Sequence, residues 1–220
     1  MRYGIALTGI AALTLPGVPA YGVSAHADPL ITTIGPYGYA VTGSTYTSTT
    51  ADWTMPTLKC TTSGASIAIW TGLDGYSSPT VEQIGAEAVC ESGTAEYFGW
   101  YDMYPGPSVD FSNALLPGDK LAASVSYASS KFTLTLQDVT QGWTKTVVET
   151  LAGADRSSAE TIVEVPSNLS CTPHETLASF TDDTVDGAAL GSLSPIEENG
   201  GSTHITVSAV SGKTFAVTCT

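Results

Sequence analysis

The feature that most constrains the fold is a series of short strand-like segments separated by tight-turn sequences, with almost no helical pattern. Several segments alternate apolar and polar residues, as in Phe132-Thr-Leu-Thr-Leu136 and Ile205-Thr-Val207. The β-branched or aromatic-rich segments are Ser66–Trp70, Leu121–Tyr127, Phe132–Gln137, Thr144–Thr150, Thr161–Val165, Thr203–Ala209 and Lys213–Thr218. Turn residues such as Leu116-Pro-Gly-Asp119 and Asn199-Gly-Gly201 separate them. The pattern predicts an all-β chain, folded as an antiparallel sandwich or barrel.

The first 27 residues have the character of a secretory signal peptide. Arg2 is their only charged residue, and the apolar run that follows, Ile5 to Leu15, is too short to span a bilayer. Ala25-His26-Ala27 offers a cleavage site of the small-x-small type, and Val18-Pro19-Ala20 is a second possible site. We therefore expect a secreted, extracellular protein with no membrane partner.

The rest of the chain has the size of one domain, without an internal repeat or a dividing linker. Residues 28–50 are rich in Gly, Thr, Ser and Tyr, and we expect a leader there that is either a short pro-segment or a first strand. Residues 51–220 are expected to form the β-sandwich domain.

The charge balance is strongly acidic. Without residues 1–27, the chain keeps 6 Lys and Arg against 21 Asp and Glu. This argues against nucleic acid and anionic membranes as partners. A chain with so few basic groups gains little self-repulsion when its carboxylates are protonated, which suits acidic surroundings. The alternative is that the acidic surface only keeps a secreted protein soluble.

Four cysteines, Cys60, Cys90, Cys171 and Cys219, allow three disulfide pairings in an exported chain. We favour Cys60–Cys90 and Cys171–Cys219, because each of these pairs is close in sequence. None of the cysteines has C-x-x-C spacing, so no zinc site is expected.

The usual hydrolase signatures are missing from the sequence. It contains neither G-x-S-x-G nor H-E-x-x-H, and His174 and His204 each stand alone. All four cysteines can pair, so a free thiol nucleophile is not expected. Carboxylates and side-chain amides remain as the reactive groups, and no cofactor or metal is expected.

Three blocks carry such groups together with aromatic residues. They are Trp70-Thr-Gly-Leu-Asp74-Gly75 followed by Gln83-Ile-Gly85, then Trp100-Tyr-Asp102-Met-Tyr104-Pro105, then Ala159-Glu160-Thr-Ile-Val-Glu164. In this order they resemble the eqolisin family of glutamic endopeptidases, whose blocks look like W-x-G-x-D-G with Q-x-G, W-Y-E-x-Y-P, and A-E-W-I-V-E. The resemblance runs from about Trp53 to Phe180. Three positions depart from the pattern: Asp102 replaces a glutamate, Thr161 replaces a tryptophan, and Glu82 adds a carboxylate beside the amide.

The resemblance implies a jelly-roll-like β-sandwich, similar to concanavalin-type lectins, and an acid-acting endopeptidase with Gln83 and Glu160 as its catalytic dyad. Glu160 would take a proton from a water that attacks the scissile carbonyl and would then protonate the leaving amine. Gln83 would donate a hydrogen bond to the developing oxyanion. Polypeptides are the expected substrates, and a monomer is the expected state.

The other matching residues are expected to bind substrate or to orient the dyad. Asp74 and Asp102 are candidates for orientation, and Glu164 is expected on the same strand face as Glu160. Trp70, Trp100 and Tyr104 are candidates for the walls of the cleft, although Trp70 also suits a sandwich core. The alternative function is a carbohydrate-binding or inactive concanavalin-like sandwich, because this architecture also serves lectins.

Overall fold

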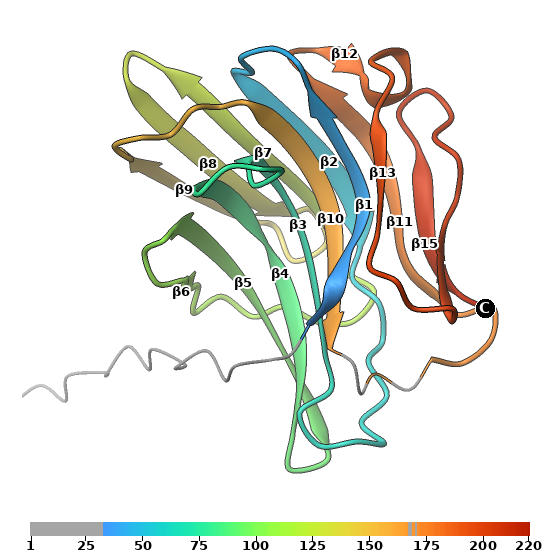
Figure 1. Cartoon of the computed structure of the whole chain (residues 1–220). Coiled ribbons are helices and arrows are strands. Elements are labelled where there is room, and N and C mark those ends of the chain that lie inside the picture. Colours follow the sequence, from blue (N-terminus) through green and yellow to red (C-terminus); the bar gives the residue numbers. More distant parts are fainter. Residues whose placement is uncertain (1–32, 167–168, 170) are drawn as a thin grey trace, which may run out of the picture.

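Two antiparallel β-sheets stacked face to face form the protein (Figure 1). The computed structural model describes residues 33–166, 169 and 171–220. The first sheet has seven strands in the order β13-β1-β10-β3-β4-β5-β6, and the second has the order β14-β15-β11-β2-β7-β8-β9, with β12 paired to β11. The expected signal peptide lies outside the described residues.

The strand bounds are β1 Thr33–Thr42, β2 Ser48–Thr54, β3 Ser66–Asp74, β4 Val81–Glu91, β5 Thr94–Tyr104, β6 Val109–Asp110, β7 Lys120–Ala128, β8 Lys131–Asp138, β9 Trp143–Glu149, β10 Ser158–Pro166, β11 Thr176–Val185, β12 Ala188–Ala189, β13 Ile196–Asn199, β14 Ile205–Val207 and β15 Phe215–Cys219. The helical content of the described residues is one short 3-10 turn, Leu190–Ser192. The predicted all-β antiparallel sandwich is therefore confirmed. Each of the seven segments predicted from composition contains or overlaps a strand.

Several long strands escaped the composition-based prediction. β4 reads VEQIGAEAVCE, with Gly, Ala and Glu where a typical strand has β-branched residues, and β5 and β11 are similarly mixed. Burial explains why β4 lacks the usual pattern. It lies between β3 and β5 with most of its positions buried, so apolar and polar residues do not alternate along it. β1 falls within residues 28–50, where it pairs with β10 and β13.

The first sheet has two different faces. Side chains from alternate positions, such as Ile69, Ile84 and Val163, enter the large apolar core between the sheets. The opposite set of positions carries Trp70 and Trp100, which pack with Ile162 in a small separate cluster. We call this second surface the outer face. It is the surface on which the candidate residues gather.

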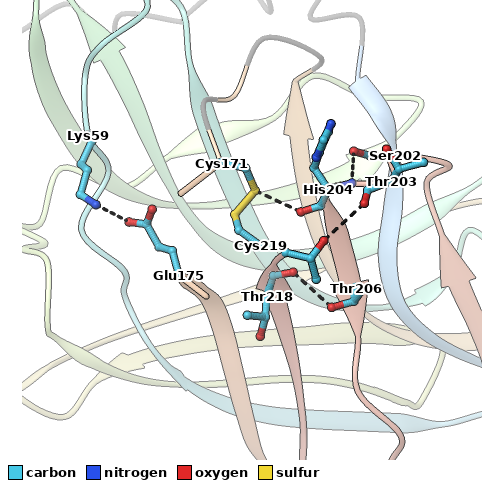
Figure 2. Close-up of a disulfide and its surroundings, with 10 residues drawn as sticks. Lys59, Cys171, Glu175, Ser202, Thr203, His204, Thr206, Thr218 and Cys219 are labelled. Atoms are coloured by element: carbon cyan, nitrogen blue, oxygen red, sulfur yellow. Dashed lines mark hydrogen bonds and ion pairs between the residues drawn. A yellow bond between two sulfur atoms is a disulfide. The ribbon is translucent and has the colours of Figure 1, made fainter. Parts of the chain in front are cut away.

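Both favoured disulfides are present. Cys60 is bonded to Cys90, with 5.3 Å between their Cα atoms, and Cys171 to Cys219, with 5.5 Å. Figure 2 shows the second bond beside the Lys59–Glu175 ion pair, whose Nζ and Oε1 atoms are 3.3 Å apart. The Cys171–Cys219 disulfide links the segment before β11 to the last strand, β15. Among the residues the structure describes, no helix has the length and hydrophobicity needed to cross a membrane.

Candidate active site

Gln83 and Glu160, more than seventy positions apart in sequence, lie in one row across the first sheet. Glu160 in β10 pairs with Gly72 in β3, and Gly72 pairs in turn with Gln83 in β4. Directly paired residues project from the same face of a sheet, so the side chains of Gln83 and Glu160 both project from the outer face. Their backbones are two strand spacings apart, about 10 Å. Gly72 places no side chain between them, so both groups can reach one small polar group.

The Glu160 carboxyl is held just after the end of β3 by Gly75, Tyr76 and Ser158, which we call its seat. Its Oε1 accepts hydrogen bonds from the backbone N–H of Tyr76 and from the hydroxyl of Ser158, the latter over 3.0 Å. The carboxyl lies against Gly75, where an added Cβ would come within 2.6 Å of Oε2. Glu160 is only 5% exposed, so this seat fixes a buried carboxyl.

The Gln83 amide is oriented by the next residue of the same row. Asp102 in β5 pairs directly with Gln83, and the Gln83 Nε2 donates to Asp102 Oδ2 over 3.3 Å. An amide nitrogen has two hydrogens, so this bond leaves the second one for another acceptor. The aspartate found here in place of the family glutamate therefore still reaches the amide.

Asp74 organises the connection that leads into β10. It is fully buried, and its carboxylate accepts hydrogen bonds from the backbone N–H groups of Arg156 and Ser157, both over 2.7 Å. The Thr80 hydroxyl adds a longer bond of 3.3 Å. Asp74 thus joins the end of β3 to the two residues that precede β10, and it does not contact Glu160 through any of these bonds.

The three aromatic candidates differ in their surroundings. Trp70 and Trp100 are buried on the outer face, on either side of Gly85, with which both pair. Trp70 is therefore separate from the core between the sheets. Tyr104 ends β5 and is half exposed. The two indoles form an apolar floor one row away from Gln83.

Two further glutamates share this face with Glu160. Glu164 lies four residues along β10, and Glu198 in β13 pairs with Gly38 of β1, which pairs with Ile162. Burial raises the pKa of Glu160 to about 8, and the negative charge of Glu198 adds to this. Burial, reinforced by Glu164, also raises the pKa of Glu198 to about 7. The three carboxyls therefore disfavour simultaneous ionisation.

Replacing Glu198 by glutamine is expected to move the ionisation of Glu160 to lower pH. The two carboxyls compete for negative charge, so a neutral amide at position 198 leaves Glu160 as the easier group to ionise. We expect the midpoint of the Glu160 carboxyl titration to shift downward by about one pH unit. The measurement is an NMR titration of the glutamate side-chain carboxyls. Glu197→Gln, an exposed neighbour on β13, is the matched control, and equal profiles for both variants would contradict the expectation.

Two of the departures from the family pattern face the core between the sheets. Thr161 is buried, and its hydroxyl lies 3.2 Å from that of Thr71, which in turn donates to the backbone oxygen of Glu160 over 2.8 Å. Glu82 is fully buried on the same side of the sheet as Ile84. Burial raises its pKa to about 8, and nearby Asp74 adds to the effect. Neither departure projects from the outer face, which carries Gln83 and Glu160.

The sequence interpretation missed Ser158, Tyr76 and Glu198. The alternation of β10 offered a signal for Ser158, because Ser158 and Glu160 are two residues apart on one strand face. No local pattern indicates Tyr76, which acts through its backbone, or Glu198, which comes from a distant edge strand. Within the described ranges, no three His, Cys, Asp or Glu side chains are grouped to hold a metal ion.

Known proteins that are similar to this chain include several peptidases. The model of the Peptidase A4 family matches residues 36–220. Aspergillopepsin-2 of Aspergillus niger is 27% identical over an alignment of 217 residues. The alignment covers 82% of this chain and 76% of the relative. Scytalido-glutamic peptidase with a transition state analog inhibitor has a TM-score of 0.72 at 24% identity, covering 84% of this chain and 98% of its own. For aspergilloglutamic peptidase from Aspergillus niger, the TM-score is 0.58 at 26% identity, with coverage of 70% and 99%.

Proposed function

Because the chain belongs to the Peptidase A4 family, we propose that it hydrolyses peptide bonds with Gln83 and Glu160 as its catalytic pair. Membership confirms the eqolisin resemblance and the assignment to glutamic-type endopeptidases. The observation that carries the proposed pair is the row Glu160–Gly72–Gln83, which brings an acid and an amide to one face with an open position between them.

In the proposed reaction, a water lies between the two side chains, above Gly72. Ionised Glu160 takes a proton from this water, whose oxygen attacks the scissile carbonyl carbon. The free N–H of Gln83 stabilises the negative oxygen that forms, while Asp102 holds the other N–H. Glu160 then gives its proton to the departing amine. The electron pair of the broken C–N bond leaves with that nitrogen, and no covalent intermediate with the protein forms.

The surroundings of Glu160 modify the expected pH dependence. An exposed glutamate has an ordinary carboxyl pKa, whereas burial raises the pKa of Glu160 to about 8. In acid the Glu198 carboxyl is neutral, which removes its repulsion and makes ionisation of Glu160 easier. The hydrogen bonds from Ser158 and the Tyr76 backbone also favour the carboxylate. We propose activity in acid with an acidic limb above that of an exposed glutamate.

Secretion is also part of the proposal. It is supported by the two disulfides, which persist in oxidising surroundings, together with the signal-like sequence of residues 1–27. Polypeptides outside the cell are then the proposed substrates.

A digestion assay tests the proposed pair through its amide member. We expect the protein to cleave denatured casein at acid pH and Gln83→Ala to lose at least about a hundredfold in kcat, the usual cost of removing an oxyanion donor. Exposed Gln141, in the turn after β8, donates to Asp119 in the turn before β7, so Gln141→Ala serves as the matched control. Full activity of Gln83→Ala, or polysaccharide binding by a protein without proteolysis, would contradict the proposal.

A further inference from the structure

Two hydrogen-bond donors converge on one oxygen of the Glu160 carboxyl. The Tyr76 N–H is shared between Glu160 Oε1 and the Ser158 Oγ, which it meets over 3.2 Å. The Ser158 hydroxyl then donates to the same Oε1 over 3.0 Å. Gly75, at φ +107°, brings the backbone underneath the carboxyl, where any side chain would collide with it. Both recorded donors are thus directed at Oε1.

Ser158 is itself tightly held. It is fully buried, at the first position of β10, and it follows the two residues whose backbone N–H groups are bound by Asp74. Two residues further on, the backbone oxygen of Glu160 accepts from Thr71. The hydroxyl of Ser158 therefore has a fixed position relative to the carboxyl it contacts, and little freedom to turn away.

We propose that Ser158 is a positioning residue that keeps Oε1 of Glu160 as a permanent hydrogen-bond acceptor and so leaves Oε2 as the oxygen that exchanges protons with water. This rests on the proposed role of Glu160 as the base. Ser158 keeps its own proton throughout: the proton from water goes to Oε2, and the same proton leaves with the amine. Ser158 is not a nucleophile, because its hydroxyl is buried and already donates to the carboxyl.

This role has a consequence that simple packing of a serine would not have. A donor to an ionised carboxylate stabilises the charged form, and the hydroxyl of Ser158 accordingly lowers the pKa of Glu160 against the effect of burial. Removing the hydroxyl should therefore raise that pKa. It should also allow the carboxyl to rotate, which lowers the fraction of molecules with Oε2 aligned on the water.

The test compares Ser158→Ala, Ser158→Thr and the control Ser126→Ala, in full pH profiles of kcat and KM on a fluorogenic peptide. Ser126 lies in β7 of the second sheet, where its hydroxyl makes one long contact of 3.5 Å to Thr133. For Ser158→Ala we expect kcat to fall about 10- to 100-fold with KM within about threefold. The acidic limb should move up by about one pH unit. Ser158→Thr, which keeps the hydroxyl, should recover most of kcat and the original limb.

The outcomes separate this inference from the proposed function. If Glu160→Gln is inactive and folded Ser158→Ala keeps the normal kcat and limb, the positioning role is overturned and the catalytic pair stands. If Glu160→Gln remains active, the proposed pair itself fails. Circular dichroism at acid pH establishes folding. Should Ser158→Ala not fold, Ser158→Cys takes its place, because a thiol fills a similar volume but is a weak donor. An unshifted limb in that variant would equally overturn the inference.

Discussion

Glu160→Gln is expected to lower kcat/KM by at least about a thousandfold at every pH, because an amide cannot accept and return the proton of the attacking water. The substitution preserves size and shape. The amide oxygen can still accept from Ser158 and from the Tyr76 N–H, so the seat described above should remain occupied. The loss should therefore lie in kcat, with little change in KM.

The same variant should unfold at higher pH than the parent protein. Glu160 is a buried acid with a raised pKa, so the folded state binds its proton more tightly than the unfolded state does. Stability from this group is fully present below the unfolded pKa and is lost as pH rises toward about 8. An amide at position 160 removes that loss. Steady-state kinetics at acid pH and thermal unfolding at pH 7 to 8 measure the two effects, and an active or less stable variant would contradict the role assigned to Glu160.

The second large effect is expected from the two acids inside the sandwich. Glu82→Gln combined with Asp183→Asn should leave stability at pH 4 nearly unchanged and should stabilise the protein strongly at pH 8. Both carboxyls are fully buried. Burial raises the pKa of Glu82 from 4.5 to about 8, and that of Asp183 from 3.8 to about 7. Asp183 reaches the core where the pairing of β11 with β2 is irregular, between Thr181 and Thr184.

The sign follows from proton binding. Between the unfolded and folded pKa values of each acid, the folded state holds a proton that the unfolded state has released, so unfolding becomes easier as pH rises. The slope is about 1.4 kcal/mol per pH unit for each group. Over the window from about pH 4 to about pH 8, the loss is about 4 to 5 kcal/mol per acid. Two such losses are comparable with the whole stability of an ordinary domain, about 5 to 15 kcal/mol.

We therefore expect the parent protein to be stable in acid and to unfold at neutral to weakly alkaline pH, with the double variant persisting about one to two pH units higher. Urea unfolding at pH 4, 6 and 8 measures the difference. Exposed Glu96 in β5 supplies the control Glu96→Gln, which should leave the pH dependence unchanged. Equal pH dependence in the parent and the double variant would show that the two buried carboxyls do not limit stability.

These stability effects also define the working range of the enzyme. The upper pH limit of activity is expected to come from ionisation of Glu82 and Asp183 within the core, which unfolds the protein. A protein with this arrangement suits acidic surroundings for a reason different from its overall charge. The acidic composition suggested such surroundings, but it did not distinguish the surface carboxylates from the buried ones.

Much of the architecture was accessible from local sequence. Period-two alternation in Phe132–Leu136 and the turn at Leu116–Asp119 are short-range signals, and β7, β8 and β9 lie where such signals are strongest. The disulfide pairing also followed from separation along the chain and is confirmed. β4, buried between two neighbouring strands, had no comparable signal, because packing on both of its faces determines its composition.

The candidate site was accessible only in part. The three blocks placed Gln83 and Glu160 in a family pattern, and their catalytic roles stay predictions. The hydroxyl at position 158 was visible two residues from the acid, but nothing local showed that the Tyr76 backbone would meet it. The family resemblance implies an orienting role for Asp102, but its contact with the Gln83 amide depends on the register of β4 against β5.

Sequence alone was sufficient for the all-β class and the family, because alternation, turn chemistry and ordered motifs are properties of neighbouring residues. It allowed three disulfide pairings and favoured the one that the structure shows. It could not say which carboxyls carry a proton. Glu82, Asp183 and Glu198 look like any other acidic residues in the chain, and their pKa values rise because strands from distant segments cover them. Desolvation and repulsion between charges act through space, so they arise only in the folded protein, where distant strands lie together.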